Sequence, residues 1–548
     1  MSADHMHNTH EQPIALVSPR YGLDFAGGAE RLVRDYAEQL HRRGHPVEVL
    51  TTCTTDMYDW NNGYPAGTTE INGVAVHRFR TDDVDIGAVH RVADRAHKQQ
   101  PITYREQLEF IRNSVNSQAL YETLRQRQDE FRCCIFAPYL FGTTYFGARA
   151  VPEKALLLPC LHDEPFARFT IYRELMEAAR GILFNVEAER RFARESLGVA
   201  NPNTAVVGYG FDPDTPAGDG ARFRATRGLP EEFVLYAGRL EGGKNVPLLL
   251  EYFVRYKTER PGPLALVLIG EGEVIQLARP DVIEIGFVSE NEKRDAFAGA
   301  TVFCQPSVNE SFSIVLMEAW IQGTPALVHG DCAVTREHVE RSGGGWWFHD
   351  YAEFRAALDA AVGDAAGRER MGRAGRAYVL REYTWDAVIA RLLAAIERFS
   401  GPEPLRAVLA RRGVRRALAF SRERFDEHLA EVVARAEADL AQGLTHPQID
   451  ALRAAARVGM PEYEVRSGAP LVGPAIAAIR RNLTSHLREP YLDPIITRQE
   501  AYNQLLLDTL LPALERSIRA QQRLERQVRL LEQQLAELRR EQGDQATE

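Results

Sequence analysis

The sequence has no excess of basic residues and no long hydrophobic run. Its 548 residues contain 66 Lys and Arg against 76 Asp and Glu, a formal net charge of −10, so the electrostatic footprint of a general nucleic-acid binder is missing. The longest clean apolar run, residues 264–269, has the length of a buried strand and is far shorter than a membrane span. The N-terminus is polar and lacks the order of a signal peptide. We therefore expect a cytoplasmic protein.

Cysteine and lysine are both scarce. The six cysteines include no CxxC pair, and most lie in apolar, strand-like runs, which predicts reduced thiols in the core of a cytosolic protein. Only five of the 66 basic residues are Lys, and one of them, Lys244, lies in a glycine-rich turn. We interpret the other four as solvated surface charge: Lys98, Lys154, Lys257 and Lys293.

Short apolar runs alternate with helical patterns over the first 400 residues, which predicts parallel sheets wound with helices. The predicted strands are 14–18, 47–52, 74–79, 133–137, 155–161, 181–185, 204–209, 233–237, 264–269, 282–285, 302–305 and 326–329. The fold class is therefore α/β, with two Rossmann-like doubly wound domains. Because ligands of such sheets bind outside the carboxyl ends of the strands, we expect the domains to face each other across a ligand-binding cleft.

The chain divides into seven predicted segments. A stretch rich in Pro, Gly, Asp and Ala separates the two series of strands, and beyond residue 400 the sequence has no Lys and little strand-like alternation. The segments are a disordered N-terminus at 1–12, a first α/β domain at 13–212, a linker at 213–228, a second α/β domain at 229–380, a helix returning to the first domain at 381–400, a helical extension at 401–500 and a coiled coil at 501–541.

The last segments carry two amphipathic patterns. Between Leu507 and Leu538, positions with alternating spacings of three and four are leucine or valine, except for the polar Ser517 and Gln521 in the middle. This heptad seam predicts a homo-oligomer through a coiled coil. The alternative is one long helix folding back on residues 401–500. Between 471 and 487, apolar residues share a helical face with arginines beside it. Such a helix either lies on an anionic membrane surface or packs against the rest of the protein.

The segment 236–245, with the sequence YAGRLEGGKN, is the first that indicates chemistry. It combines a strand, a glycine turn, Arg239 and then Lys244 at the start of a helix. Glycines at such a turn let backbone amides approach an anion, and a helix N-terminus favours negative charge. The planar fork of Arg239 and the point charge of Lys244 suit two phosphates. The alternative is a tight turn with two solvated cations.

The segment 306–319, PSVNESFSIVLMEA, is the second. Glu310 lies on the loop after a strand, and Glu318 lies in the following helix, whose predicted start near Phe312 offers free amides to a phosphate. From Phe312 to Glu318 the helix rises roughly 9 Å, which is comparable to the span of a diphosphate plus a ribose. One carboxylate can thus reach a sugar while the other accepts hydrogen bonds from ribose hydroxyls. Alternatively, Glu318 is a surface residue beside an apolar stripe.

These two segments together resemble family 4 of the retaining glycosyltransferases. The resemblance rests on Glu310 and Glu318 separated by seven residues, on the preceding GRL and on Lys244 five residues after the Arg. It extends over residues 13–399, because other motifs match in order: the glycine loop 27–30, GHPVEV at 44–49, VGYGFD at 207–212, LIGEG at 268–272 and a glycine turn at 343–345. The family implies the GT-B fold, with the acceptor on the first domain and the nucleotide-sugar donor on the second.

The resemblance also implies roles for the motif residues. Arg239 and Lys244 would hold the donor diphosphate, Glu310 would face the transferred sugar and Glu318 would bind the ribose. The donor site would be completed by the residues that follow Glu310, namely Ser311, Phe312, Ser313 and Ile314.

Two residues of the first domain are implied as well. His162 matches the family's His that faces the donor sugar, and Gly28 would bring a backbone amide toward the donor phosphate or the acceptor; each is otherwise a plain turn residue. The chain departs from the family pattern at three positions that are often glycine, where it has Ser311, Ser313 and Asn245. These departures weaken any assignment of the sugar more than of the reaction class.

The reaction that the family implies is transfer of a sugar from a nucleotide-diphosphate donor to an acceptor hydroxyl with retained configuration. It requires no metal or other cofactor, and the leaving phosphate accepts the proton, so Glu310 need not be a nucleophile. Two Asp-x-Asp pairs, at 83–85 and 212–214, could hold Mg²⁺ in principle, but we interpret both as solvated turns. The histidines near the N-terminus are interpreted as a frayed end rather than a metal site: His5, His7 and His10.

Three other functions fit parts of the sequence. A dehydrogenase is disfavoured, because the first strand is not followed by G-x-G-x-x-G and the second ends in Thr51 and Thr52 without an acidic ribose ligand. A GT-B-fold sugar-nucleotide epimerase and an inactive scaffold acting through the coiled coil stay open. The expected partners are a nucleotide-sugar donor and a glycan or lipid-linked acceptor, in bacterial polysaccharide or glycoconjugate biosynthesis. We expect no nucleic acid, and at most peripheral contact with the inner face of a membrane.

Overall fold

The structure, a computed structural model, describes residues 11–25, 27–56, 59–272 and 279–400. The predictions for the N-terminal histidines, the helical extension, the amphipathic helix and the coiled coil concern residues outside these ranges. Within the described ranges, no helix is both long enough and apolar enough to cross a membrane.

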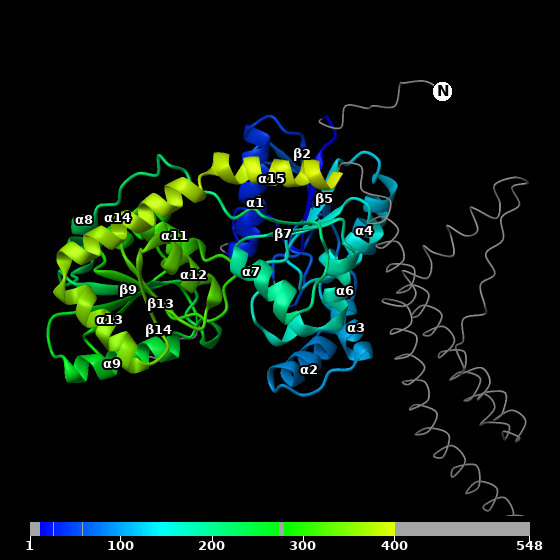
Figure 1. Ribbon diagram of the computed structural model, residues 1–548. Helices are drawn as coiled ribbons and strands as arrows, with labels where there is room; N and C mark the ends of the chain where they lie inside the picture. The colour runs from blue at the N-terminus through cyan, green and yellow to red at the C-terminus, as the bar shows by residue number, and fades with distance from the viewer. Residues whose placement is uncertain (1–10, 26, 57–58, 273–278, 401–548) are drawn as a thin grey trace, which may run out of the picture. The chain divides into compact units, whose positions relative to one another are not determined.

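The first lobe is built on an eight-stranded sheet with the order β3-β4-β2-β1-β5-β6-β7-β8 (Figure 1). All neighbouring strands pair in parallel except β3, which is antiparallel to β4. The strands are β1 Ile14–Ser18, β2 Val47–Thr52, β3 Gly67–Ile71, β4 Val74–Phe79, β5 Cys133–Phe136, β6 Ala155–Leu157, β7 Gly181–Phe184 and β8 Thr204–Val206. The helices around them are α1 Gly28–Arg42, α2 Ile86–His97, α3 Tyr104–Arg112, α4 Gln118–Gln126, α5 Gly142–Ala150, η1 Pro165–Arg168, α6 Thr170–Ala178, α7 Glu187–Arg191 and η2 Phe192–Ser196.

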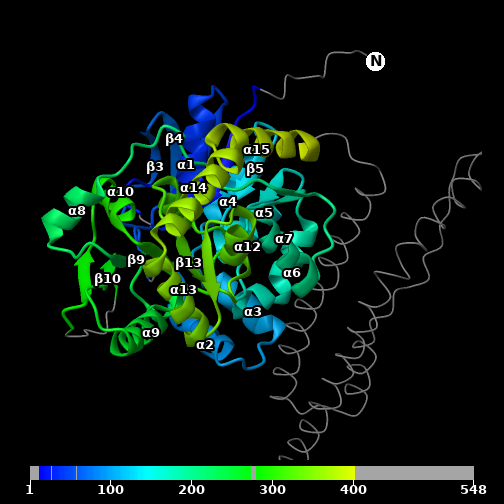
Figure 2. The ribbon, with the colours of Figure 1, turned by 60° about the vertical axis from the view of Figure 1, so that its left-hand side comes forward.

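The second lobe has a six-stranded parallel sheet with the order β11-β10-β9-β12-β13-β14 (Figure 2). Its strands are β9 Phe233–Ala237, β10 Ala265–Ile269, β11 Val282–Gly286, β12 Val302–Gln305, β13 Ala326–His329 and β14 Gly345–Phe348. Its helices are α8 Gly220–Arg227, η3 Gly242–Lys244, α9 Val246–Glu259, α10 Glu290–Gly299, α11 Ile314–Ile321, α12 Ala333–Ser342, α13 Tyr351–Gly363 and α14 Ala365–Glu382. The final described helix, α15 Trp385–Ser400, contacts α1 and β7 of the first lobe.

All twelve predicted strands are present, and two further strands were missed. The first, β3, has the sequence GTTEI and is mostly exposed, so it carries no hydrophobic pattern that predicts a strand. The second, β14, begins at Gly345, inside the glycine run that was expected to be a turn. Residues 220–227 of the predicted linker form α8, which packs against α10.

Aromatic side chains fill the contact between the lobes. Phe312 of the second lobe is buried and lies with its ring centroid 6.0 Å from that of Tyr209 and 5.1 Å from that of Tyr383. Trp385 at the start of α15 stacks edge-on against Tyr36 of α1 at 6.0 Å. These contacts belong to a single hydrophobic cluster that includes residues of both sheets, so the residues after β12 are held against the first lobe.

Lys257 is one of the four lysines that were expected to be solvated surface charge, and for this residue the expectation is wrong. Its side chain is buried at the end of α9, where its ammonium group donates hydrogen bonds to the carbonyl oxygens of Gly262 and, at 2.8 Å, Leu264. A buried ammonium needs such acceptors, and this one ties the end of α9 to the start of β10.

Candidate active site

The loop between β9 and α9 carries the first predicted motif. Arg239 projects from it with a largely exposed side chain and lies 3.1 Å from the Glu241 carboxylate. Asn245 adopts the left-handed conformation with φ 58°, which explains why similar sequences use glycine there and why Asn, which tolerates this conformation, replaces it. The Asn245 side chain donates to the Pro306 carbonyl at 3.1 Å. The loop is thereby joined to the loop after β12, which carries the second motif.

Lys244 and Glu310 are brought together by this junction. The Lys244 ammonium lies 2.8 Å from Glu310 Oε1, and both side chains are mostly buried. Tyr236 closes the same region from β9, since its hydroxyl donates to the Arg239 carbonyl at 2.6 Å. Burial raises the pKa of Tyr236, and the nearby Glu310 carboxylate adds to the effect. The cation expected at the diphosphate and the carboxylate expected at the sugar are therefore neighbours.

The turn before α11 differs from the prediction that a helix starts near Phe312. Ser313 has φ 70°, and α11 begins only at Ile314. Ser313 is buried, and its hydroxyl donates to Gln305 Oε1 at 2.6 Å. This hydrogen bond helps to hold a conformation that a residue with a side chain seldom adopts. No side chain caps α11, so the amides of its first turn remain free to bind a phosphate.

The left-handed turn at Ser313 predicts that two small substitutions differ in their effect on stability. Ser313→Ala loses the hydrogen bond to Gln305 but keeps the strained backbone, whereas Ser313→Gly loses the same bond and relieves the strain. We expect the glycine variant to be more stable than the alanine variant by about 1 kcal/mol. Urea unfolding of both variants measures the difference, and an alanine variant as stable as the glycine variant would contradict the assigned conformation.

Glu318 lies in α11 with its carboxylate buried between two cations. Arg31 from α1 of the first lobe lies 2.7 Å from Glu318 Oε1, and Lys293 from α10 lies 3.2 Å away. Burial would raise the pKa of the Glu318 carboxyl, but Lys293 and Arg31 outweigh it and hold the pKa below its usual value. Glu318 is thus not the surface residue of the alternative interpretation, and Lys293 is not simply solvated charge. The second oxygen of Glu318, Oε2, is buried and accepts no hydrogen bond, although the Lys293 ammonium is 3.2 Å from it.

Arg31 and Lys293 were missed by the sequence analysis. Arg31 directly follows the glycine loop 27–30, and Lys293 is one of only five lysines in the chain. The scarcity of Lys was a usable signal, but Glu318 and these two partners lie far apart in the sequence, so only the folded chain shows that they meet.

His162 lies on the loop after β6, which ends at Leu157 and is shorter than predicted. Its Nδ1 atom is buried without a hydrogen bond and lies 3.6 Å from Glu164 Oε1. The loop turns at Cys160, which has φ 56°. Burial raises the pKa of the Cys160 thiol, and a hydrogen bond with Ser311 acts in the opposite direction. Cys160, two residues before His162, is therefore close to Ser311 of the second lobe.

A fully buried carboxyl, Glu189 of α7, anchors this loop. Its two oxygens accept hydrogen bonds from the Leu161 amide at 2.6 Å and the Asn185 amide at 2.5 Å. Burial nevertheless raises the pKa of Glu189 to about 8. The folded state therefore binds a proton more tightly than the unfolded chain does, and the contribution of Glu189 to stability falls as the pH rises from about 5 to 8.

We expect the free energy of unfolding of Glu189→Gln to fall less steeply than that of wild type as the pH rises from 5 to 8. The slope should decrease without vanishing, because burial also raises the pKa of Glu174 to about 8. Urea unfolding of wild type and variant at several pH values measures the two slopes. Equal slopes would show that Glu189 keeps its ordinary pKa in the fold.

Gly28 is the first residue of α1, and Gly27 precedes it as the N-cap. A Cβ atom at Gly28 would meet no atom within 4 Å, so the space beside its backbone is open. The adjacent Glu30 carboxylate accepts from Arg20 Nε at 3.1 Å. The glycine loop is thus held by an ion pair, with one exposed backbone position that a ligand can approach.

The two Asp-x-Asp pairs have local structural roles. Asp85 accepts from the Ala88 amide and caps α2, and Asp212 accepts from the Asp214 amide in a turn. Among the described residues, no group of three or more His, Cys, Asp or Glu side chains is arranged to hold a metal ion.

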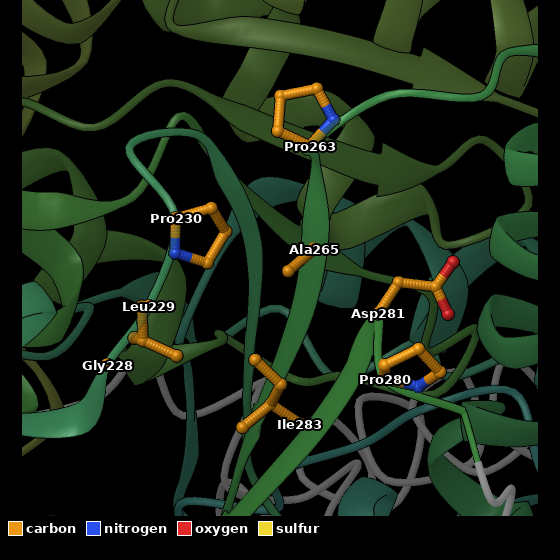
Figure 3. Close-up of a pocket in the computed structure, with 8 residues that line it drawn as sticks. All are labelled: Gly228, Leu229, Pro230, Pro263, Ala265, Pro280, Asp281 and Ile283. Carbon is orange, nitrogen blue, oxygen red and sulfur yellow. The ribbon is translucent and has the colours of Figure 1, made fainter.

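A hollow of about 450 Å³ lies elsewhere in the second lobe (Figure 3). It is lined mainly by apolar residues and prolines at the amino ends of β10 and β11, including Pro263, Ala265 and Ile283. Its one charged residue, Asp281, is paired with Arg279 at 2.8 Å. The predicted site residues belong to the opposite, carboxyl ends of the strands, where ligands of parallel sheets bind, so we do not assign this hollow to the site.

Comparison with known proteins points to glycosyltransferases. Residues 221–378 match the family described as glycosyl transferases group 1. A D-inositol 3-phosphate glycosyltransferase of Kineococcus radiotolerans is 28% identical over 437 residues, covering 71% of this chain and 94% of that protein. One from Streptomyces avermitilis is 29% identical over 248 residues, covering 41% of this chain and 53% of that protein. The chain spans 57% of the length of a further such relative from Nocardioides.

Solved structures show the same fold. Sucrose-phosphate synthase from Thermosynechococcus elongatus has a TM-score of 0.53 at 18% identity, over 71% of this chain and 98% of that one. Anabaena HepE in complex with UDP and glucose has a TM-score of 0.51 at 17% identity, over 70% of this chain and 99% of that one. The matched family and the two Rossmann-like lobes together support a glycosyltransferase of the GT-B fold, and they favour it over the epimerase and scaffold alternatives.

Proposed function

We propose that this protein transfers a sugar from a nucleoside-diphosphate sugar to an acceptor hydroxyl with retention of anomeric configuration. The observation that carries the proposal is the pairing of Lys244 with Glu310 on the loop before the uncapped start of α11, with Glu318 buried further along the same helix. This set combines a cation and free amides for a diphosphate with two carboxylates that can accept hydrogen bonds from sugar and ribose hydroxyls. We place the reaction in bacterial polysaccharide or glycoconjugate biosynthesis.

Each group has a distinct task in the proposed reaction. Negative charge develops on the departing diphosphate, and Lys244, Arg239 and the α11 amides stabilise it electrostatically. Lys244 is already paired with Glu310, so the diphosphate shares a cation whose position is fixed in advance. Glu310 faces the sugar, and the leaving phosphate accepts the acceptor's proton. No residue therefore needs to act as a nucleophile or a separate base.

The second carboxylate oxygen of Glu318 supports its assignment to the ribose. Oε1 is held by Arg31, whereas Oε2 is buried and accepts no hydrogen bond, with only the charge of Lys293 close to it. A buried acceptor without a donor is costly, and a ribose hydroxyl would supply the missing donor. Since solved structures of the same fold were determined with UDP, uridine is the first base to test. Metal independence, self-association through residues 501–541 and peripheral membrane contact stay predictions.

A panel of nucleotide sugars tests the proposal. We expect one donor to be hydrolysed slowly without an acceptor and to be consumed equally well in excess chelator. With an acceptor, proton NMR should show that the product keeps the donor's anomeric configuration. An inverted product, or loss of activity on chelation with recovery on adding Mg²⁺, would overturn the proposed mechanism. Conversion of the donor to an epimeric sugar nucleotide would identify an epimerase instead.

A further inference from the structure

Arg78, near the end of β4, is a buried cation without an anionic partner. Its side chain is 6% exposed, and it makes no ion pair or hydrogen bond with any described residue. The other two buried arginines in the described ranges are both paired, Arg20 with Glu30 and Arg132 with Glu397 at 2.7 Å. A buried charge without a counter-charge destabilises a fold, so a partner for Arg78 is to be expected.

Two further polar groups beside Arg78 lack partners. The Tyr21 hydroxyl and Thr51 Oγ1 are buried without a hydrogen bond, as is Nη1 of Arg78 itself. Thr51 of β2 lies directly opposite Arg78 in the parallel pairing of the two strands. Tyr21 follows β1; burial and the charge of Glu38 raise its pKa, and the charge of Arg78 is close enough to act in the opposite direction. The ends of three adjacent strands thus carry three groups that lack a partner and can donate hydrogen bonds.

The carboxylates nearest this cluster are already engaged. Asp24 accepts from the Tyr64 hydroxyl at 3.0 Å, and the Tyr64 ring in turn covers the Arg78 guanidinium at 4.1 Å. The charges of Glu38 and Asp35 act on Tyr21, but Glu38 accepts from Arg42 at 2.7 Å and from Asn72 at 2.8 Å, and Asp35 accepts from the Tyr209 hydroxyl. None of these oxygens is within ion-pair distance of Arg78. A buried water molecule could satisfy Tyr21 and Thr51, but it could not neutralise the guanidinium.

The cluster lies at the same edge of the first sheet as the candidate site. Thr51 and Arg78 are close to the carboxyl ends of β2 and β4, where ligands of parallel sheets bind. Arg20, beside Tyr21, contacts the Thr55 carbonyl after β2 and pairs with Glu30 in the first turn of α1. The loops around the cluster are therefore connected to the helix that begins at Gly28.

We propose that Arg78, Tyr21 and Thr51 form a subsite for an anionic group, a phosphate monoester or a carboxylate, on the acceptor. This inference rests on the proposed function, because a glycosyltransferase needs an acceptor, which the family resemblance expects on the first domain. Guanidinium pairs well with either anion, and the two hydroxyls can donate to its remaining oxygens. The subsite would discriminate strongly against a neutral acceptor, which would leave the buried charge uncompensated.

Thermal unfolding with simple anions tests the subsite without requiring turnover. The probes are inorganic phosphate and acetate, each compared with chloride at equal ionic strength and with nucleoside diphosphate present to fill the donor site. We expect the Tm of wild type to rise with phosphate, with acetate or with both. The anion that raises the Tm more shows whether the acceptor carries a phosphate monoester or a carboxylate. Arg78→Met should abolish this rise. Arg91→Met, which removes an exposed arginine of α2, should keep it.

Calorimetric titration of the same anions gives the magnitudes. Arg78→Met should weaken anion binding at least tenfold, and Thr51→Val, which is close in shape, should weaken it a few-fold and serves if the first variant does not fold. Equal responses to chloride, or unchanged binding in both variants, would overturn the subsite. Nucleoside-diphosphate binding, measured separately in each variant, should be unaffected. If wild type binds anions through Arg78 but binds no nucleotide, the proposed function fails while the anion site stands.

Discussion

Replacing Lys244 with alanine is expected to lower kcat/KM for sugar transfer at least 100-fold. The substitution removes a cation from the departing diphosphate, and such electrostatic contacts are worth about 3 kcal/mol in the transition state. It also leaves Glu310 mostly buried without its partner at 2.8 Å, so the carboxylate that faces the sugar loses its fixed position. Initial rates at several concentrations of the true donor measure the effect.

Lys98→Ala is the matched control for this variant. Lys98 ends α2 and pairs with Asp94, but both side chains are about three-fifths exposed, so the loss of the pair should cost little. We expect kcat/KM of this control to equal that of wild type. A Lys244 variant that retains wild-type kcat/KM would remove the β9–α9 loop from the donor site.

Replacing Glu318 with alanine is expected to weaken both nucleotide binding and the fold. The ribose loses its carboxylate, and the mostly buried Arg31 and Lys293 lose their shared partner. Arg31 then keeps Asp35 at 3.5 Å, and Lys293 keeps Glu290 at 2.9 Å, an exposed carboxylate. Removing one partner of such a group destabilises a protein by about 3 kcal/mol. Differential scanning calorimetry should show a lower Tm, and calorimetric titration should show weaker binding of nucleoside diphosphate.

The ion pairs of Glu318 also predict how its contribution depends on pH. Because the folded state holds the pKa of Glu318 below its usual value, the stabilisation is present at neutral pH and is lost only as the pH falls through the folded pKa. Glu340→Ala, which removes an exposed carboxylate of α12 paired with Arg336, is the control and should leave Tm and nucleotide binding unchanged. A Glu318 variant with wild-type Tm and affinity would show that Asp35 and Glu290 suffice as partners of Arg31 and Lys293 and that the ribose binds elsewhere.

The sequence predicted strands well where both faces are buried, because such strands appear as short, continuous apolar runs. β1, β2, β9, β12 and β13 begin and end at the predicted residues. β3 lies at a sheet edge with exposed polar residues and carries no such pattern. Helix starts were predicted less well, as the turn before α11 shows. A single backbone angle at Ser313 decides where that helix begins, and no periodicity reports it.

The sequence predicts the motifs of the candidate site, but it does not predict which residues contact one another there. Each motif could be identified along the chain, but the partners of Glu318 come from α1 and α10, and the anchor of the His162 loop comes from α7. Long-range ion pairs of this kind leave no local spacing in the sequence. Because Lys is rare in this sequence, each lysine can be examined individually, but Arg is too abundant for the same approach. Arg31 and Arg78 were therefore not distinguished from the other arginines until the fold showed their burial and their neighbours.

Direct binding of nucleoside diphosphates is the measurement closest to the central claim. Calorimetric titration of UDP, GDP and ADP into the full-length protein in excess chelator should show one of them binding with a stoichiometry of about one per chain. The same titration should show at least tenfold weaker binding to Lys244→Ala and unchanged binding to Lys98→Ala, because the loss of one charge-assisted phosphate contact costs about 1.5–3 kcal/mol. Absence of binding by all three nucleotides, or equal affinity in the two variants, would contradict a donor site built from Lys244, Glu310 and Glu318.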